Sequence, residues 1–411
     1  MNILILNHYA GSLELGMEFR PYYLGKEWIK LGHKVTIIAA DFSHLRSKQP
    51  SLKSDFFCEN IDGITYVWIK TMKYKSSGFK RVLNLLMFIT KSLINYKKIT
   101  TIANPEIVIA SSTYPLDIYP SYLISKKNKA KLVFELHDLW PLSPMIIGGY
   151  SKHHPFIWLM QKAENFACKK CDCYISMLKY AKDYLIGHGL KNEKFFYVSN
   201  GFSEDELNPT VIPLPKLHQK LIDKVKTESR LIVGYTGGHA PSNALKCFVS
   251  ASNYFADSHD IAFVLVGKGS HKHELIEMAT EKNQKNIYFL PPISKSAIPT
   301  LLHQFDILYA GGVNSYLHRY GTSYNKIIDY MLAEKPIIFA VNEPISIIKE
   351  VGCGIQIPAE NETEIIKTII LFSKLSNEER TTMGKKGRKY AIQKLNYSYL
   401  AKKFIEAVNQ S

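Results

Sequence analysis

Short apolar runs rich in β-branched residues alternate with helical patterns along this sequence, and no other feature constrains the fold as strongly. In the first half of the chain the runs that predict strands are Asn2–Leu6, Val35–Ala39, Ile64–Ile69, Ile107–Ala110, Leu132–Glu135 and Cys173–Ser176. Strands separated by helices indicate a parallel sheet whose strands are joined by crossover helices. We therefore predict an α/β domain over residues 1–207.

A proline-rich stretch interrupts this alternation and then the alternation restarts. Residues 208–229 contain Pro209, Pro213 and Pro215 and are interpreted as a linker with at most a short helix. The second set of predicted strands is Leu231–Tyr235, Ile261–Val266, Ile287–Phe289, Ile307–Tyr309 and Pro336–Ala340. The sequence thus predicts a second domain over residues 230–389 and one long terminal helix over residues 390–411. Both domains are expected to be Rossmann-like and doubly wound, facing a cleft.

The charge of the chain narrows its partners. It has 411 residues, with 52 Lys+Arg against 36 Asp+Glu and a formal net charge of +16. Nucleic acid, an anionic membrane surface and a phosphorylated substrate all suit such a charge. There is no uninterrupted apolar run of about 18 residues and no signal-peptide pattern at the start. We expect a cytoplasmic protein, either soluble or peripheral on the inner face of the cell membrane.

One segment, Gly63–Pro105, is basic throughout and contains no acidic residue; its basic residues are Lys70, Lys73, Lys75, Lys80, Arg81, Lys91, Lys97 and Lys98. Within it, apolar residues at three- and four-residue steps predict a helix over Phe79–Ile99. Two interpretations stay open: a surface helix with its apolar stripe in the core, or a basic amphipathic helix on anionic lipid. Nucleic acid is disfavoured because the segment carries no recognisable binding motif.

Glycine-rich turns follow two predicted strands of the second domain. The turns are Gly237-Gly238-His239 and Gly267-Lys268-Gly269. Paired glycines at a strand-to-helix turn let backbone N–H groups approach an anion, although two glycines are also common in ordinary turns. A G-x-G-x-x-G fingerprint is absent, which disfavours a classical dinucleotide site.

The most informative segment is Arg319-Tyr320-Gly321-Thr322-Ser323-Tyr324-Asn325-Lys326-Ile327-Ile328-Asp329. It starts as a small polar loop and is expected to become a helix at about Ser323, which would be its N-cap. A phosphate at that helix start would meet free N–H groups and the Lys326 ammonium. Asp329 would then either bind the hydroxyls of a ribose or form a surface ion pair with Lys326.

Polar residues also follow the strand Leu132–Glu135. His137 and Asp138 stand just before Trp140-Pro141, at the carboxyl end of a buried strand, where doubly wound proteins keep their chemistry. The alternative is that Asp138 caps the next turn and His137 is only a polar residue. The cluster Cys168, Cys171 and Cys173 has no partner pair, so zinc is disfavoured and no metal or other cofactor is expected.

Together these segments resemble a GT-B glycosyltransferase of retaining family 4. The residues that carry the resemblance are Gly16, Arg20, Leu31–Val35, Asn104–Ile109, His137–Pro141, Asn200–Phe202, Val266–Gly269, Tyr320–Lys326, Asp329 and Lys335-Pro336. The nearest subgroup is that of bacterial O-antigen and capsule enzymes such as L-fucosamine transferases. The resemblance implies a terminal helix that crosses back onto the N-terminal domain. It departs from the family at Gly321, where a donor-site carboxylate is usual.

The resemblance implies transfer of a sugar from a nucleotide diphosphate, with UDP and an N-acetylated deoxyhexosamine favoured, to a lipid-linked saccharide. The donor-binding residues it implies are Gly16, Gly237, Gly238, His239, Lys268, Arg319, Gly321, Thr322, Ser323, Asn325, Lys326 and Asp329. The catalytic residues it implies are His137 and Asp138, and the acceptor or membrane residues are Lys70, Lys73, Lys75, Lys80 and Arg81. The alternatives are a UDP-N-acetylglucosamine 2-epimerase-like enzyme and an inactive membrane-associated scaffold of envelope assembly.

Overall fold

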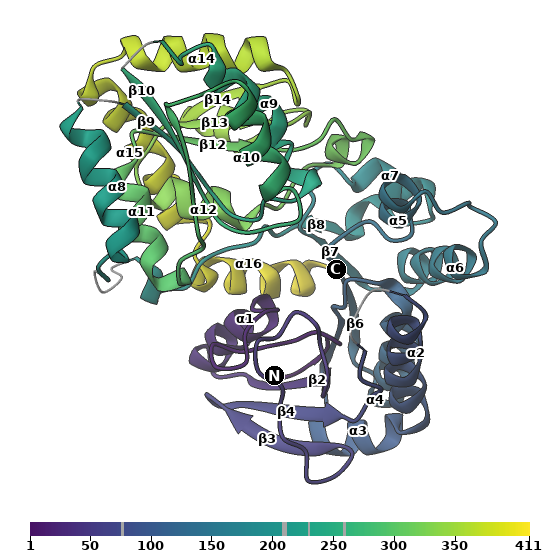
Figure 1. Ribbon diagram of the computed structural model, residues 1–411. Coiled ribbons are helices and arrows are strands. Elements are labelled where there is room, and N and C mark those ends of the chain that lie inside the picture. Colours follow the sequence, from purple (N-terminus) through teal and green to yellow (C-terminus); the bar gives the residue numbers. More distant parts are fainter. Residues whose placement is uncertain (75–77, 208–211, 229–230, 258–259) are drawn as a thin grey trace. The chain divides into compact units, whose positions relative to one another are not determined.

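The computed structural model describes residues 1–74, 78–207, 212–228, 231–257 and 260–411 (Figure 1). The chain divides into two compact units. The first unit comprises Met1–Ser203 and Tyr397–Ser411, and the second comprises Glu204–Asn396.

A sheet of eight described strands forms the centre of the first unit, in the order β3-β4-β2-β1-β5-β6-β7-β8. All neighbours are parallel except the β3–β4 pair at the edge. The strands are β1 (Asn2–Leu6), β2 (Lys34–Ala40), β3 (Phe57–Ile61), β4 (Ile64–Ile69), β5 (Ile107–Ala110), β6 (Lys131–Leu136), β7 (Cys173–Ser176) and β8 (Phe195–Tyr197). The inner strands β1, β5 and β7 are almost wholly apolar and buried, as expected of a sheet covered on both faces.

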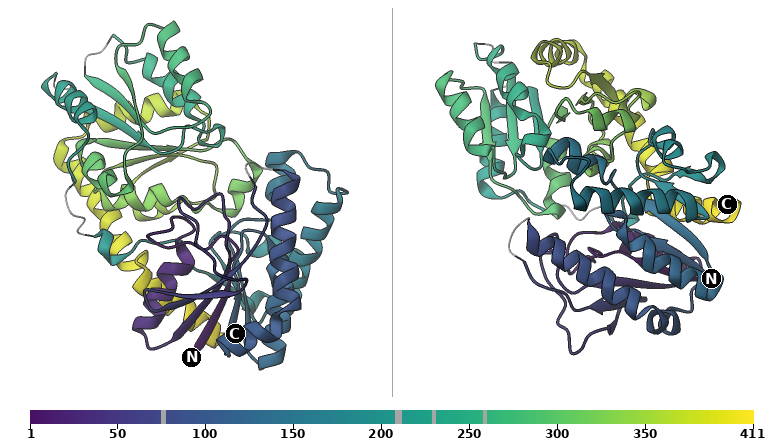
Figure 2. Two further views of the ribbon diagram at one scale, coloured as in Figure 1. Left: turned by 60° about the horizontal axis from the view of Figure 1, so that its bottom comes forward. Right: turned by 90° about the vertical axis from the view of Figure 1, so that its right-hand side faces the viewer.

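Helices cover both faces of this sheet. The left view in Figure 2 shows α1 and α16 on one face and α2 and α4 on the other. The helices and short 3-10 turns are α1 (Arg20–Lys30), α2 (Phe79–Ile94), α3 (Tyr96–Ala103), η1 (Pro115–Asp117), α4 (Ile118–Asn128), α5 (Leu142–Gly148), α6 (Pro155–Lys170), α7 (Lys182–Gly187), η2 (Asn192–Lys194) and α16 (Tyr397–Gln410).

The last helix, α16, is part of the core of the first unit. Its Phe404 ring packs edge-on against Trp28 of α1 at 5.1 Å between centroids, and the Trp28 indole Nε1 donates to the Ala401 carbonyl at 3.1 Å. Tyr23 and Tyr397 stack at 5.0 Å. Trp28 and Phe404 are fully buried, so the end of the chain is held by apolar burial against its beginning.

The second unit has a sheet of six described strands, all parallel, in the order β11-β10-β9-β12-β13-β14. They are β9 (Leu231–Thr236), β10 (Ile261–Val266), β11 (Ile287–Leu290), β12 (Ile307–Gly311), β13 (Ile337–Ala340) and β14 (Gly354–Ile357). The helical elements are η3 (Glu204–Glu206), α8 (Lys216–Thr227), η4 (Pro241–Asn243), α9 (Leu245–Asn253), α10 (Lys272–Glu281), η5 (Lys295–Ala297), α11 (Ile298–Gln304), η6 (Tyr316–Tyr320), α12 (Asn325–Leu332), α13 (Ile347–Val351), α14 (Glu362–Lys374) and α15 (Asn377–Lys394).

The predicted α/β class with two parallel-sheet domains is confirmed, whereas two helix predictions are wrong. The single terminal helix predicted for residues 390–411 is two helices, because α15 ends before Leu395 and Asn396 and α16 starts at Tyr397. The basic helix predicted over Phe79–Ile99 breaks at Asn95, whose side chain turns back to bond the Lys91 carbonyl. The predicted linker contains α8, although residues 208–211 and 229 lie outside the described part.

The sequence also missed three short strands, β3, β8 and β14. Each is partly exposed and lies at or next to a sheet edge, so its apolar pattern is weak. Among the described residues, no helix is both long and apolar enough to span a bilayer.

The packing of α16 leads to a stability prediction. We expect Phe404→Ala to lower the free energy of unfolding by about 3 to 5 kcal/mol, because it empties a buried site beside Trp28. Lys402→Ala, an exposed change on the same helix, should cost no more than about 0.5 kcal/mol. Urea unfolding followed by tryptophan fluorescence measures both, and equal costs would contradict the role given to α16.

Candidate functional site

The strand order of the first sheet reverses between β1 and β5, and polar residues gather at the carboxyl ends of these strands. The Asn7 side-chain amide donates to the Ser111 carbonyl at 2.6 Å. The His8 backbone N–H donates to the Ser112 hydroxyl at 3.1 Å. Ligands of doubly wound folds bind at such a reversal point, outside the carboxyl ends of the strands.

A buried network joins this point to β6. Arg20 Nε of α1 donates to Glu135 Oε1 at 2.9 Å, and both side chains are almost completely buried. Ser111 Oγ donates to Glu135 Oε2 at 2.6 Å, and His137 Nε2 lies 3.2 Å from the same carboxylate oxygen. His137 Nε2 also lies 3.0 Å from Ser111 Oγ. The network therefore ends on His137, one of the two predicted catalytic residues.

The carboxylate of Glu135 is held ionised. Burial acts to raise the pKa of Glu135, but the Arg20 guanidinium and the hydrogen bonds from His137 and Ser111 outweigh it and hold that pKa well below its usual range. Glu135 can therefore only accept hydrogen bonds.

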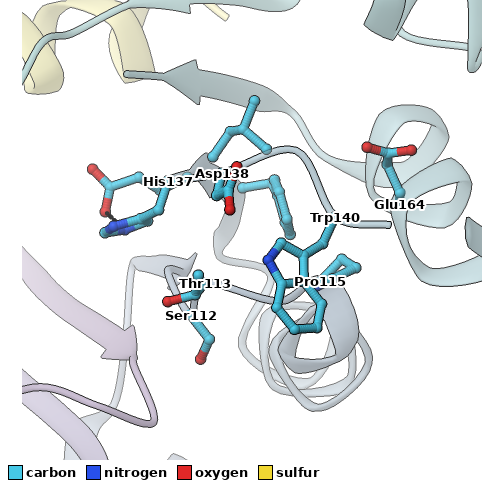
Figure 3. Close-up of a pocket in the computed structure, with 10 residues that line it drawn as sticks. Ser112, Thr113, Pro115, His137, Asp138, Trp140 and Glu164 are labelled. Atoms are coloured by element: carbon cyan, nitrogen blue, oxygen red, sulfur yellow. Dashed lines mark hydrogen bonds and ion pairs between the residues drawn. The ribbon is translucent and has the colours of Figure 1, made fainter. Parts of the chain in front are cut away.

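His137 and Asp138 line a pocket with Ser112, Thr113, Pro115 and Trp140 (Figure 3). Asp138 Oδ1 accepts from the Leu139 N–H at 2.8 Å and from the Ser143 hydroxyl at 2.6 Å. Asp138 thus does hold the turn that leads into α5, as one interpretation of the sequence proposed. Its second oxygen, Oδ2, accepts no hydrogen bond from the described residues.

The start of the basic helix α2 packs at the same edge of the sheet. Phe88 of α2 stacks on the His8 ring, and the Arg81 guanidinium lies 5.9 Å from the centre of the Tyr9 ring. Lys70, Lys73 and Lys80 are exposed, whereas Lys75 lies outside the described residues. Lys91 is not a free cation, because it pairs with Asp55 and donates to the Lys70 carbonyl.

In the second unit, the strand order reverses between β9 and β12, and a glycine turn follows β9. Gly237 has φ +139°, a conformation that residues with side chains rarely adopt. A Cβ built on Gly267 would lie 1.9 Å from the Gly237 carbonyl oxygen, so the two predicted glycine turns are in direct contact. Gly237 and Gly238 are exposed, which leaves their backbone open to a ligand.

Lys326 of α12 reaches this turn. Its ammonium donates to the Tyr235 hydroxyl at 3.0 Å and to Asn243 Oδ1 at 2.7 Å. A Cβ on Gly237 would lie 3.4 Å from Lys326 Nζ. Burial lowers the pKa of Lys326 to about 8, so the ammonium is still charged in most molecules at neutral pH. A partly desolvated cation beside an exposed glycine turn is suited to bind an anion.

Asp329 lies one turn further along α12, where burial raises its pKa to about 7 and Lys295 and Glu206 have smaller, opposite effects. It forms no ion pair with Lys326 and accepts no hydrogen bond from the described residues, so the surface ion pair is not formed. An acidic side chain held without a partner stabilises nothing in the fold itself.

His239 does not have the form expected of a phosphate ligand. The side chain is fully buried, and neither ring nitrogen has a partner among the described residues. Burial, with Lys272 and Lys326 nearby, lowers the pKa of His239 to about 4, so the ring is neutral at physiological pH.

The other predicted donor residues are more dispersed. Arg319 packs over the Tyr316 ring at 4.5 Å, Thr322 donates to Glu343 at 3.0 Å, and Lys268 is exposed. Asn325 is the first residue of α12. Gly16 belongs to the first unit and forms bridges with Ser12 and Arg46 there.

The predicted cap of α12 is wrong. The N-cap is Tyr324 and not Ser323, and the Tyr324 side chain makes no capping hydrogen bond. Gly321 has φ +96°, which a glutamate would adopt only with strain. The backbone therefore gives a reason why this chain has no carboxylate at that position.

The cysteine cluster is structural: Cys168, Cys171 and Cys173 are all buried. Among the described residues, no group of three or more His, Cys, Asp or Glu side chains is placed to hold a metal ion.

Two glycosyltransferase family models match this chain. Residues 16–206 match the family model described as Glycosyltransferase Family 4, and residues 222–390 match the model described as Glycosyl transferases group 1. The chain is a two-domain glycosyltransferase. No curated protein matches its sequence.

Solved structures share the GT-B fold of this glycosyltransferase at low identity. HepE of Anabaena, in complex with UDP and glucose, is 16% identical with a TM-score of 0.65, over 100% of this chain and 99% of that one. Sucrose-phosphate synthase of Thermosynechococcus elongatus is 13% identical with a TM-score of 0.71, over 99% and 98%. A trehalose-6-phosphate structure from E. coli, bound with UDP-2-fluoro glucose, is 10% identical with a TM-score of 0.74, over 100% and 99%.

The sequence did not assign a role to several residues of the two candidate sites. Tyr235 and Asn243 hold Lys326, and Lys272 donates to the Gly267 carbonyl at 2.8 Å. In the first unit, Glu135 and Ser111 hold His137. A charged residue inside an apolar strand was the available signal for Glu135. A tyrosine in a strand and an asparagine in a turn carry no such signal.

The unpartnered Asp329 leads to a pH prediction. Its raised pKa means that the folded state keeps a proton that the unfolded chain has lost, so its contribution lowers stability as the pH rises from about 4 to about 7 and is constant above that. Asp329→Asn cannot ionise. We expect its stability relative to the wild type to grow by roughly 1 to 2 kcal/mol between about pH 5 and pH 8. Denaturant unfolding measures this, with the exposed Asp223→Asn as control; equal pH dependences would contradict the account.

Proposed function

We propose that this glycosyltransferase moves a sugar from a UDP-linked donor to a lipid-linked saccharide in bacterial O-antigen or capsule synthesis, with retention of the anomeric configuration. The donor sugar proposed is an N-acetylated deoxyhexosamine. The second unit would bind the donor and the first unit the acceptor. Two of the similar solved structures hold UDP or a UDP-sugar, which supports the choice of nucleotide.

The observation that carries the donor proposal is the position of Lys326. Its ammonium lies beside the exposed Gly237 turn and is fixed there by Tyr235 and Asn243. As the bond between sugar and phosphate breaks, negative charge grows on the diphosphate. A fixed cation and backbone N–H groups stabilise that charge without a large rearrangement. We therefore propose a metal-independent reaction in which Lys326 and the glycine turns balance the diphosphate.

Asp329 supports the same assignment. A carboxylate that accepts no hydrogen bond within the described residues is available to accept two from ribose hydroxyls. Such hydrogen bonds would also favour its ionised form, which burial otherwise disfavours.

On the acceptor side, His137 and Asp138 would orient the hydroxyl that attacks the sugar. Asp138 Oδ1 is used by Leu139 and Ser143, which leaves Oδ2 for a ligand. The transition state is expected to resemble an oxocarbenium ion, as in glycoside hydrolysis.

We further propose that the enzyme works peripherally on the cytoplasmic face of the inner membrane. Lys70, Lys73 and Lys80 are exposed, and Phe79 at the start of α2 is 75% exposed. Cations around an exposed aromatic ring suit an anionic interface, where each cation contributes about 1 kcal/mol.

Lys326→Ala tests the donor proposal. We expect kcat/KM for UDP release from a panel of UDP-sugars, with a lipid diphosphate acceptor, to fall by about 10² to 10³-fold. Lys285→Ala, an exposed lysine between α10 and β11, is the control and should keep the wild-type rate. Unchanged turnover in Lys326→Ala would refute the phosphate role. Turnover of a UDP-sugar without any acceptor would instead indicate an epimerase.

Replacement of Lys70, Lys73, Lys75, Lys80 and Arg81 by glutamine tests the membrane proposal. We expect binding to phosphatidylglycerol vesicles to weaken at least about tenfold, since roughly 1 kcal/mol is lost per cation near the surface. The control replaces five exposed lysines of the second unit, Lys216, Lys220, Lys224, Lys385 and Lys386, and so removes the same charge. Equal weakening in both variants would show that only net charge matters.

A further inference from the structure

The network behind His137 determines which of its ring nitrogens carries a proton. Ser111 Oγ lies 2.6 Å from Glu135 Oε2, and the ionised carboxylate can only accept, so the hydroxyl proton points to Glu135. The Ser111 oxygen then offers a lone pair to His137 Nε2 at 3.0 Å. Glu135 Oε2 offers another at 3.2 Å. Two acceptors face Nε2, which must therefore be the protonated nitrogen.

Glu135 is itself held in place by Arg20. The guanidinium donates through Nε to Glu135, through Nη1 to the Ser199 carbonyl at 2.5 Å and through Nη2 to the Val198 carbonyl at 3.1 Å. The three donors are committed to three fixed acceptors just after β8 and within β6. The orientation of the carboxylate is thus determined by the backbone of the first unit.

The other ring nitrogen of His137, Nδ1, makes no hydrogen bond to any described residue. The His137 side chain is 8% exposed and lines the pocket of Figure 3. A neutral imidazole with a proton on Nε2 has a lone pair on Nδ1 and accepts a hydrogen bond there.

We propose that Arg20 and Glu135 are positioning residues that fix His137 as the Nε2–H tautomer, so that Nδ1 accepts a hydrogen bond from the hydroxyl of the sugar acceptor. This inference rests on the proposed function for the identity of the hydroxyl. It also explains why the buried Arg20–Glu135 ion pair is present. Replacing such a pair by apolar side chains often leaves a protein equally stable, so stability alone does not require it.

Several charged groups lie around His137 or line the same pocket. They are Arg20 on α1, Glu135 on β6, Asp138 in the loop that follows, Asp117 on η1 and Glu164 on α6. Burial raises the pKa of both Asp117 and Glu164 to about 7, so these two carboxyls can also change charge near neutral pH. A change in turnover with pH near neutrality therefore does not by itself report on His137.

Nitrogen-15 NMR of the His137 imidazole tests the inference directly, with the signal assigned by its loss in His137→Gln. The wild type should show one tautomer with the proton on Nε2. In Glu135→Gln the amide can donate as well as accept, so a mixture of both tautomers is expected. In the same variant, kcat should fall roughly tenfold or more, while KM for the donor stays within about twofold of the wild-type value.

Two further variants keep the test decisive. If Glu135→Gln is poorly folded because Arg20 is left unpaired, Arg20→Met with Glu135→Gln removes both charges and should give the same mixture. Glu164→Gln also removes a buried carboxyl at this pocket, but Glu164 bonds Gln161 and Tyr184, so the His137 tautomer should be unchanged.

A wild-type signal with the proton on Nδ1, or a single Nε2–H tautomer in both Glu135 variants, would overturn the inference. These outcomes do not depend on turnover. Absence of transfer with a correct tautomer would instead contradict the proposed function.

Discussion

Parallel strands joined by crossover helices all end at one edge of their sheet, and the chemistry of this chain depends on that constraint. In the first unit, residues that follow β1, β5 and β6 meet at this edge: Asn7, Ser111 and His137. In the second unit, the turn after β9 meets the helix after β12, which brings Gly237 to Lys326. Residues far apart in sequence are thus adjacent because the carboxyl ends of neighbouring parallel strands lie at the same edge of the sheet.

Both sites contain charges that cost free energy to bury. The Arg20–Glu135 pair is almost fully buried, and breaking such a pair by removing one partner typically costs about 3 to 5 kcal/mol. Burial lowers the pKa of Lys326, and burial is also the main cause of the raised pKa of Asp329. Groups held against their preferred charge state are more common at functional sites than in the rest of a protein. This is the physical argument for placing function at these residues.

The sequence was sufficient for the fold class and for most strands, because a buried parallel strand is a continuous apolar run and most of these strands are buried on both faces. The sequence did not predict the elements that depend on contacts with the rest of the fold. The edge strand β3 has exposed residues at Cys58, Glu59 and Asn60, so its pattern is not that of a core strand. The break between α15 and α16 occurs at Leu395 and Asn396 without a proline or glycine to mark it.

For the sites, the sequence identified the residues with strong local signals and missed their partners. Lys326, Asp329 and the glycine turns stand in recognisable segments. Tyr235 and Asn243 lie 91 and 83 positions from Lys326 in the sequence and contact it only in the folded structure. Ser323 was a reasonable cap by residue type, but the chain enters α12 at Tyr324. Such details follow from packing between elements, which a single sequence does not specify.

We propose above all that the second unit binds a nucleotide diphosphate between the glycine turns and α12. Hydrogen exchange with and without saturating UDP tests it most directly, because each backbone amide reports its own protection. We expect slower exchange in residues 237–243, 267–269 and 321–330, and no change in residues 135–143 of the first unit. Protection confined to the first unit, or none at saturating UDP, would contradict it.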